Sequence, residues 1–104
     1  MARIGFLMRL KNDSVVDEYL RLHREIDEEV LAAHRRAGIR NYSIYRDGLR
    51  LFAYFESDDP AASMERLAQE PIMKHWWSLT GPLMETGEDG RPRVTILEEA
   101  FYME

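Results

Sequence analysis

The chain has 104 residues, of which 45% are hydrophobic and 32% charged, a composition that favours one compact domain over residues 1–104 and argues against disorder. Its formal net charge of −5 argues against a nucleic-acid partner, because no cluster of lysine and arginine is present to bind phosphates. There is no cysteine, no signal-peptide pattern and no apolar run of membrane-spanning length, so we expect a cytoplasmic protein without disulfides or a membrane partner.

The first predicted element is a β-strand over residues 3–11. Ile4, Phe6, Met8 and Leu10 occupy alternate positions in this segment. This two-residue repeat is typical of a strand with one buried face.

Residues 14–37 form the longest amphipathic segment and are predicted to be one continuous helix. Ser14 and Asp17 have the spacing of a capping box, and Gly38 can take the left-handed conformation that ends a helix. His23 falls within the apolar stripe of this helix. The stripe has the three- and four-residue spacing of a helix packed on one side, and it consists of Val16, Tyr19, Leu20, Ile26, Val30, Ala33 and Ala37.

A β-hairpin is predicted around Asp47-Gly48, the type of dipeptide that most strongly favours a two-residue hairpin loop. Its strands would cover residues 41–46 and 49–56, and this loop length would place Tyr42 opposite Ala53. One face of the hairpin is expected to lie under the helices, and it carries Tyr42, Ile44, Leu51, Ala53 and Phe55.

The remaining chain is predicted to contain two helical segments and a last strand. Asp59-Pro60 is typical of a helix N-terminus, and Pro71 begins a second helical segment that ends at Gly81. Residues 94–103 have the β-branched and aromatic composition of a strand. The resulting order is that of the split βαβ motif, so we expect an α+β ferredoxin-like fold whose antiparallel sheet has helices on one face.

The other face of that sheet would be uncovered in a monomer. Tyr45, Phe52 and Tyr54 lie on it, and exposed aromatic surface of this kind is typical of a partner interface. Two such sheets can pair across a two-fold axis. We therefore expect a homodimer with the architecture of a dimeric α/β barrel.

Two groups of side chains are candidates for a ligand site. Tyr19 and His23 lie one helical turn apart and can contact one ligand together, or His23 is a buried structural histidine and Tyr19 a packing residue. Trp76 and Trp77 point about 100° apart on a helix, either as core packing or as a platform for the apolar face of a sugar. Tyr42 adds a third aromatic residue with a hydroxyl on the face under the helices.

The spacing of the histidines argues against a metal site. In a continuous helix, His34 would lie about 16 Å beyond His23 along the axis, too far for both to bind one ion. No other histidine or carboxylate pair has the spacing of metal ligands, so no metal is expected. Asp27, one turn after His23, is either an orienting or proton-accepting partner of that histidine or a solvated surface residue.

The order and spacing of four short motifs resemble the L-rhamnose mutarotase family over nearly the whole chain. The motifs are Tyr19-x-x-x-His23, Asn41-Tyr42-x-Ile44-Tyr45, Trp76-Trp77 and the terminal Glu99-Ala100-Phe101-Tyr102. The resemblance implies a dimeric ferredoxin-like barrel with His23 as the catalytic proton donor and Tyr19, Tyr42, Trp76 and Trp77 as sugar-binding residues. The chain departs from the family pattern just after His23, where family members typically have an Ile-Trp-Pro segment and this chain reads Arg24-Glu25-Ile26-Asp27-Glu28.

The function implied by this resemblance is that of an isomerase, a sugar mutarotase without a cofactor. It would interconvert the α and β anomers of L-rhamnose or a related 6-deoxy sugar by acid/base opening of the ring, and a histidine suits that proton transfer. Two alternatives stay open. One is a small dimeric-barrel monooxygenase in which His23 or His75 binds haem, and the other is a non-catalytic sugar-binding module.

Overall fold

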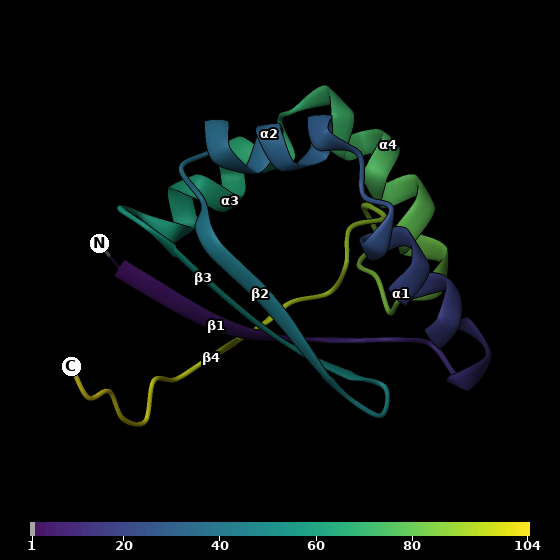
Figure 1. The fold of residues 1–104 in the computed structure, drawn as a ribbon, viewed down its shortest axis with the longest axis horizontal. Coiled ribbons are helices and arrows are strands. Elements are labelled where there is room, and N and C mark those ends of the chain that lie inside the picture. The colour runs from purple at the N-terminus through teal and green to yellow at the C-terminus, as the bar shows by residue number, and fades with distance from the viewer. Residues whose placement is uncertain (1) are drawn as a thin grey trace.

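The computed structural model describes residues 2–104 and shows a four-stranded antiparallel sheet with the described helices on one face (Figure 1). Strands β1 (Ala2–Arg9), β2 (Arg40–Asp47), β3 (Arg50–Ser57) and β4 (Thr95–Leu97) lie in the order β2-β3-β1-β4. The helices are α1 (Val16–Arg24), α2 (Glu28–Arg36), α3 (Pro60–Ala68) and α4 (Pro71–Thr80), with short 3-10 helices η1 (Asp13–Val15) and η2 (Gly81–Leu83). This arrangement confirms the predicted α+β ferredoxin-like fold. No helix within residues 2–104 is long and apolar enough to span a lipid bilayer.

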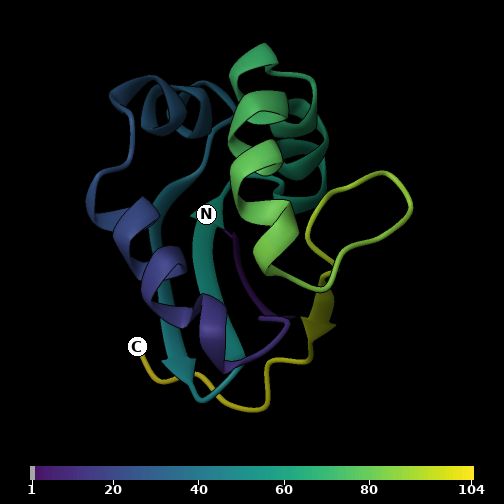
Figure 2. The ribbon, with the colours of Figure 1, turned by 90° about the vertical axis from the view of Figure 1, so that its right-hand side faces the viewer.

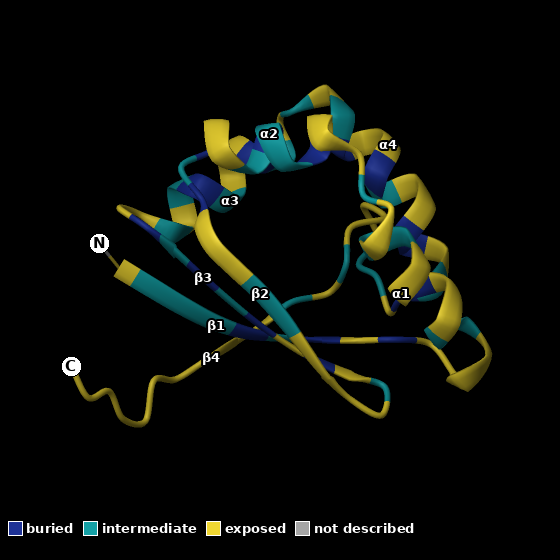
Figure 3. Cartoon of the chain, viewed as in Figure 1, coloured by how far each residue is buried: buried dark blue, intermediate teal, exposed yellow. Residues whose placement is uncertain are grey.

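The core lies between the helices and the inner face of the sheet. Figure 2 shows the α1–α2 segment beside the α3–α4 segment, and Figure 3 shows buried residues where helices and strands face each other. The sheet contributes Phe6 and Met8 from β1 and Leu51, Ala53 and Phe55 from β3. The helices contribute Tyr19, Val30, Ala33, Leu67, Met73 and Trp76.

The hairpin between β2 and β3 pairs Ile44 with Ala53. The predicted pairing of Tyr42 with Ala53 is therefore wrong by two residues, because the loop begins at Gly48, whose φ is 62°, and not at Asp47. Side chains of a strand alternate with a period of two, so a shift of two residues leaves the predicted inner and outer faces unchanged.

The predicted continuous helix over residues 14–37 is broken. Helix α1 ends at Arg24, Asp27 has extended backbone angles (φ −67°, ψ 134°), and α2 begins at Glu28. The Asp27 carboxylate accepts the backbone N–H of Glu29 at 2.8 Å and so caps the new helix. The chain can therefore change direction between α1 and α2, which a single helix could not do.

The prediction for residues 14–37 is wrong about the N-terminal cap and right about the C-terminal end. At the N-terminal end, Asn12 Oδ1 accepts the backbone N–H of Ser14 at 3.0 Å, so Ser14 is not the cap and α1 begins without a side-chain cap. At the C-terminal end the predicted stop at Gly38 is confirmed, because Gly38 has φ 87° and the Ile39 N–H donates to the His34 carbonyl at 3.0 Å.

The last strand is shorter than predicted. Strand β4 pairs only with the middle of β1, and residues 98–104 have no regular secondary structure. The prediction of a strand over residues 94–103 is therefore wrong beyond Leu97. Side-chain contacts hold part of this tail near β1, because the Arg3 guanidinium binds the Glu99 carboxylate at 2.9 Å and lies 3.4 Å from the centre of the Tyr102 ring.

Candidate functional site

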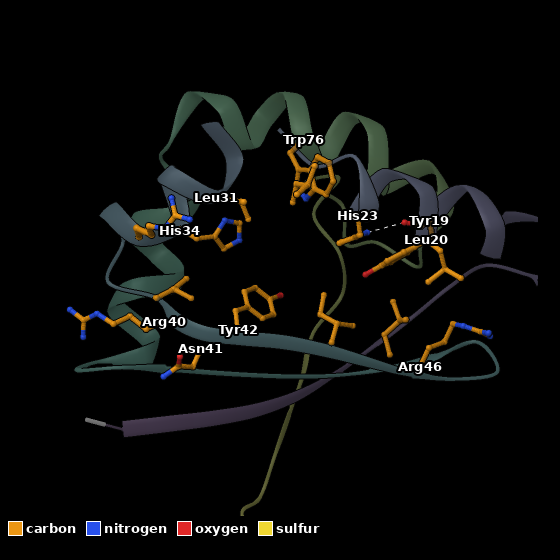
Figure 4. Close-up of a pocket in the computed structure, with 15 residues that line it drawn as sticks. Tyr19, Leu20, His23, Leu31, His34, Arg40, Asn41, Tyr42, Arg46 and Trp76 are labelled. Carbon is orange, nitrogen blue, oxygen red and sulfur yellow. Dashed lines mark hydrogen bonds between the residues drawn. The ribbon is translucent and has the colours of Figure 1, made fainter. Parts of the chain in front are cut away.

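A cavity of about 820 Å³ lies between α1, α2 and the inner face of β2 (Figure 4). Its volume falls within the roughly 300–1,000 Å³ of small-molecule sites. A second cavity of about 410 Å³ adjoins it and reaches α3 and α4. Tyr19, His23, His34, Tyr42 and Trp76 line both cavities, so four of the five predicted site residues meet at one place.

Helix α1 brings Tyr19 and His23 together through their spacing of four residues. The two rings stack, with centroids 4.3 Å apart and planes inclined by 15°. His23 Nδ1 lies 2.9 Å from the Tyr19 carbonyl oxygen, and because a carbonyl can only accept, Nδ1 is the donor. The neutral ring therefore has an unprotonated Nε2, which can exchange a proton with a ligand.

The half-buried position of His23 affects its titration. Burial lowers the pKa of His23, and the hydrogen bond to the Tyr19 carbonyl opposes that shift. Burial also raises the pKa of the Tyr19 hydroxyl far above its usual value, so this group stays protonated. The pKa shifts therefore leave His23, and not Tyr19, as the proton-transfer candidate of the stacked pair.

Trp76 and Trp77 leave α4 in different directions, as their adjacent positions predict. Trp76 is buried, and its ring meets the ring of His23 edge to face, with centroids 5.2 Å apart and an angle of 78°. Trp77 is half-buried and lines the second cavity but not the larger one. The Arg91 guanidinium lies 5.7 Å from the centre of the Trp77 ring.

A bulge in β2 places Tyr42. The pairing with β3 shifts between Arg40 and Ser43, and Asn41 has a φ of 52°, a left-handed conformation that asparagine tolerates better than most residues. The Tyr42 ring lies 5.6 Å from Phe55, and its hydroxyl points into the cavity (Figure 4). The side chain as a whole is 36% exposed because the cavity is open, yet desolvation around the hydroxyl raises the pKa of Tyr42.

His34 also lines the cavity, although the reasoning from the sequence did not include it among the site residues. That reasoning assumed one straight helix, whereas the break before Asp27 brings α2 across the cavity from α1. The His34 ring lies 5.5 Å from the Tyr42 ring, and its Nδ1 is 2.7 Å from the Val30 carbonyl oxygen. The signal for the break was Asp27 followed by two glutamates, the pattern of a helix N-terminus.

The structure places Asp27 away from the cavity. The Asp27 side chain is exposed, caps α2 and lies outside both cavity linings. Across residues 2–104, no group of three or more His, Cys, Asp and Glu side chains is arranged to hold a metal ion. The ionisable side chains that line the larger cavity are those of histidine, tyrosine and arginine.

Sequence and structure comparisons identify relatives of the chain over its full length. The sequence pattern of the L-rhamnose mutarotase family matches residues 3–103. An L-rhamnose mutarotase of Lactiplantibacillus plantarum is 39% identical over 106 residues, with 100% of both chains covered. The crystal structure of an L-rhamnose mutarotase from Formosa agariphila is 30% identical and has a TM-score of 0.86, again over 100% of both chains.

A more distant structure shares only the fold. A dimeric ferredoxin-like protein from an uncultured marine organism is 14% identical, with a TM-score of 0.61 over 97% of each chain. The match to the family pattern and the full-length similarity to its members show that the chain belongs to the L-rhamnose mutarotase family.

Proposed function

We propose that this chain is an isomerase that interconverts the α and β anomers of L-rhamnose or a related 6-deoxy sugar. The proposal rests on the position of His23 in a cavity lined by Tyr19, Tyr42 and Trp76. Its Nδ1 is engaged by the Tyr19 carbonyl, which leaves Nε2 available to a ligand. Membership of the L-rhamnose mutarotase family supports the choice of sugar.

In this proposal each predicted residue has a role in binding or proton transfer. Protonated His23 donates to the ring oxygen of the sugar while the ring opens, and it takes the proton back when the ring closes. Trp76 and Tyr19 offer aromatic surface to the apolar edge of the sugar, and the Tyr42 hydroxyl offers a hydrogen bond. Trp77 contacts the part of the sugar that reaches the second cavity.

The test is anomer exchange followed by saturation-transfer NMR with L-rhamnose and other 6-deoxy sugars. His23→Asn keeps an amide donor where Nδ1 bonds the Tyr19 carbonyl but cannot transfer a proton. We expect it to reduce the rate of exchange by roughly 10²- to 10⁴-fold. The matched control is His75→Asn, since His75 is exposed on α4 and lies outside both cavity linings.

The same experiments separate the alternatives. If the protein accelerates anomer exchange of none of the sugars, the mutarotase proposal is refuted. If His23→Asn accelerates exchange as fast as the parent does, the role of His23 is refuted. Saturable sugar binding without exchange would indicate a binding module. A haem-dependent absorption band would instead indicate a monooxygenase.

We also propose that the protein acts as a homodimer in the cytoplasm, with its single domain forming half of a dimeric α/β barrel. The support is the outer face of the sheet, defined here as Leu7, Tyr45, Phe52, Tyr54 and Leu97, which no described helix covers. Tyr45 is 70% exposed on this face. Pairing two such faces would remove this aromatic surface from water.

A further inference from the structure

We propose that His34 is the second proton-transfer residue of this site, the base that takes the proton of the C1 hydroxyl while His23 protonates the ring oxygen. This inference rests on the proposed mutarotase function. His34 is not among the residues that carry the family resemblance, and its position in the cavity follows from the break between α1 and α2.

The two histidines reach the cavity from different helices. In Figure 4 the His23 ring enters from α1 and the His34 ring from α2, on either side of the space above Tyr42. Each ring donates from Nδ1 to the carbonyl four residues earlier, at 2.9 Å for His23 and 2.7 Å for His34. Both neutral rings therefore have an unprotonated Nε2, and His34 is held in the tautomer of a base.

The larger cavity offers few other bases. None of its lining residues is an aspartate or glutamate. The pKa values of the Tyr19 and Tyr42 hydroxyls are raised by burial, so neither becomes a phenolate near neutral pH. Asp89 lines the second cavity, but its carboxylate is 3.2 Å from the Arg91 guanidinium and so already has a cationic partner.

The surrounding charges disfavour a second proton on the histidine pair. Burial lowers the pKa of His34, the hydrogen bond to the Val30 carbonyl opposes this, and the charge of protonated His23 lowers it further. Arg35 of α2 and Arg40 and Arg46 of β2 also line the larger cavity, and Arg93 lines the second. These cations raise the cost of a second positive charge beside His34.

The proton transfers balance over one cycle. The O–H bond of the C1 hydroxyl breaks, its proton passes to His34 Nε2, and its electron pair forms the C1 carbonyl. The bond between C1 and the ring oxygen breaks at the same time, and that oxygen receives the proton of His23 Nε2. Rotation about the C1–C2 bond presents the other face of the aldehyde. Ring closure then reverses both transfers, so that His23 regains its proton and His34 gives its proton back to the C1 oxygen.

The test compares pH profiles of kcat/KM for anomer exchange in the parent, His34→Asn and His23→Asn. The amide introduced by His34→Asn would keep a donor for the Val30 carbonyl, so the fold of α2 is retained while proton transfer is lost. We expect exchange in His34→Asn to slow by roughly 10²-fold or more. The parent should give a bell-shaped profile, His34→Asn should lose its acid limb, and His23→Asn its alkaline limb.

Sugar affinity and a control variant distinguish a structural role of His34 from a role in proton transfer. Sugar affinity, measured by the fluorescence of Trp76 and Trp77, should stay within a few-fold of the parent in His34→Asn and in a second variant, His34→Gln. His75→Asn should match the parent throughout. Three results would overturn the role of His34. They are exchange at the parental rate in His34→Asn, an unchanged acid limb of its pH profile, and a loss of sugar affinity with no other effect. Absent exchange in the parent would instead refute the mutarotase function itself.

Discussion

His23 and His34 show how one local hydrogen bond can prepare a side chain for chemistry. Each imidazole bonds the carbonyl of its own helix four residues earlier, at Tyr19 and at Val30. The bond fixes the ring orientation and the tautomer through a backbone carbonyl, so no second side chain of the cavity is needed for it. Both rings are half-buried, and burial disfavours their protonated form. The stability of the fold therefore depends on pH.

We predict that the two histidines make the fold less stable below about pH 6.5, the ordinary pKa of the group. Their pKa values are lowered by burial, so between the folded and unfolded pKa values the unfolded chain binds more protons. The contribution of the two histidines to the free energy of unfolding is therefore fully present above their unfolded pKa. It is lost as the pH decreases toward their folded pKa. Urea unfolding of the parent should therefore show a lower midpoint at pH 5.5 than at pH 7.5.

Replacement of one histidine should remove part of this dependence. The difference between the two midpoints should be smaller for His34→Asn than for the parent, whereas His75→Asn, which changes an exposed side chain, should leave it unchanged. The lowered pKa values of Glu18, Glu56 and Glu70 act below their ordinary value of 4.5, outside this pH range. Equal pH dependence in the parent and His34→Asn would contradict the prediction.

At the scale of elements, the break between α1 and α2 decides the shape of the cavity. Apolar periodicity predicted a helix through residues 14–37, because Ile26 keeps the spacing of the stripe even where the backbone leaves the helix. Periodicity reports which side of a segment is buried, and it is insensitive to a turn that preserves that side. The local signals were present in Asp27 and in the basic residues at the end of α1, Arg21 and Arg24.

We predict that Asp27 acts through its helix cap and has no part in proton transfer. Asp27→Ala should lower the free energy of unfolding by about 1 kcal/mol, because the Glu29 N–H loses its acceptor. Asp27→Asn should keep most of that stability, since asparagine caps as well as aspartate does. It should also keep the parental rate of anomer exchange. Urea unfolding and NMR exchange measure the two effects.

The asparagine variant is the control that separates a cap from a charge. If Asp27 oriented or deprotonated His23 through its carboxylate, Asp27→Asn would slow exchange well below the parental rate. An asparagine variant that is as unstable as Asp27→Ala would equally contradict the capping role. The structure places the carboxylate outside the cavity linings, so we expect neither outcome.

The sheet shows which features of the fold sequence patterns predict well. Alternation assigned Leu51, Ala53 and Phe55 to the buried face, and all three are buried although the predicted register was wrong by two residues. The bulge that directs Tyr42 into the cavity depends on the left-handed backbone of Asn41. Asparagine permits that conformation but does not require it, so the sequence alone could not predict the bulge.

In the molecule as a whole, the two faces of the sheet differ in how far they are buried. The inner face is covered by helices, whereas the outer face keeps Tyr45 and Phe52 exposed. The tail adds to this side, because Arg3 of β1 binds Glu99 and lies over the ring of Tyr102. Aromatic surface on an uncovered sheet, beside a tail with no regular structure, suits burial against a second copy of the chain.

We predict that sedimentation velocity at micromolar concentration finds a dimer, and that Phe52→Glu converts it to a monomer. A stable interface buries about 800 Å² on each partner, and a carboxylate at the centre of two paired sheets would be desolvated without a partner. The matched control is Leu79→Glu, because Leu79 is 40% exposed against 36% for Phe52 but belongs to helix α4 and not to the outer face of the sheet. Leu79→Glu should remain a dimer. A monomeric parent, or a Phe52→Glu variant that still sediments as a dimer, would show that the outer face does not pair.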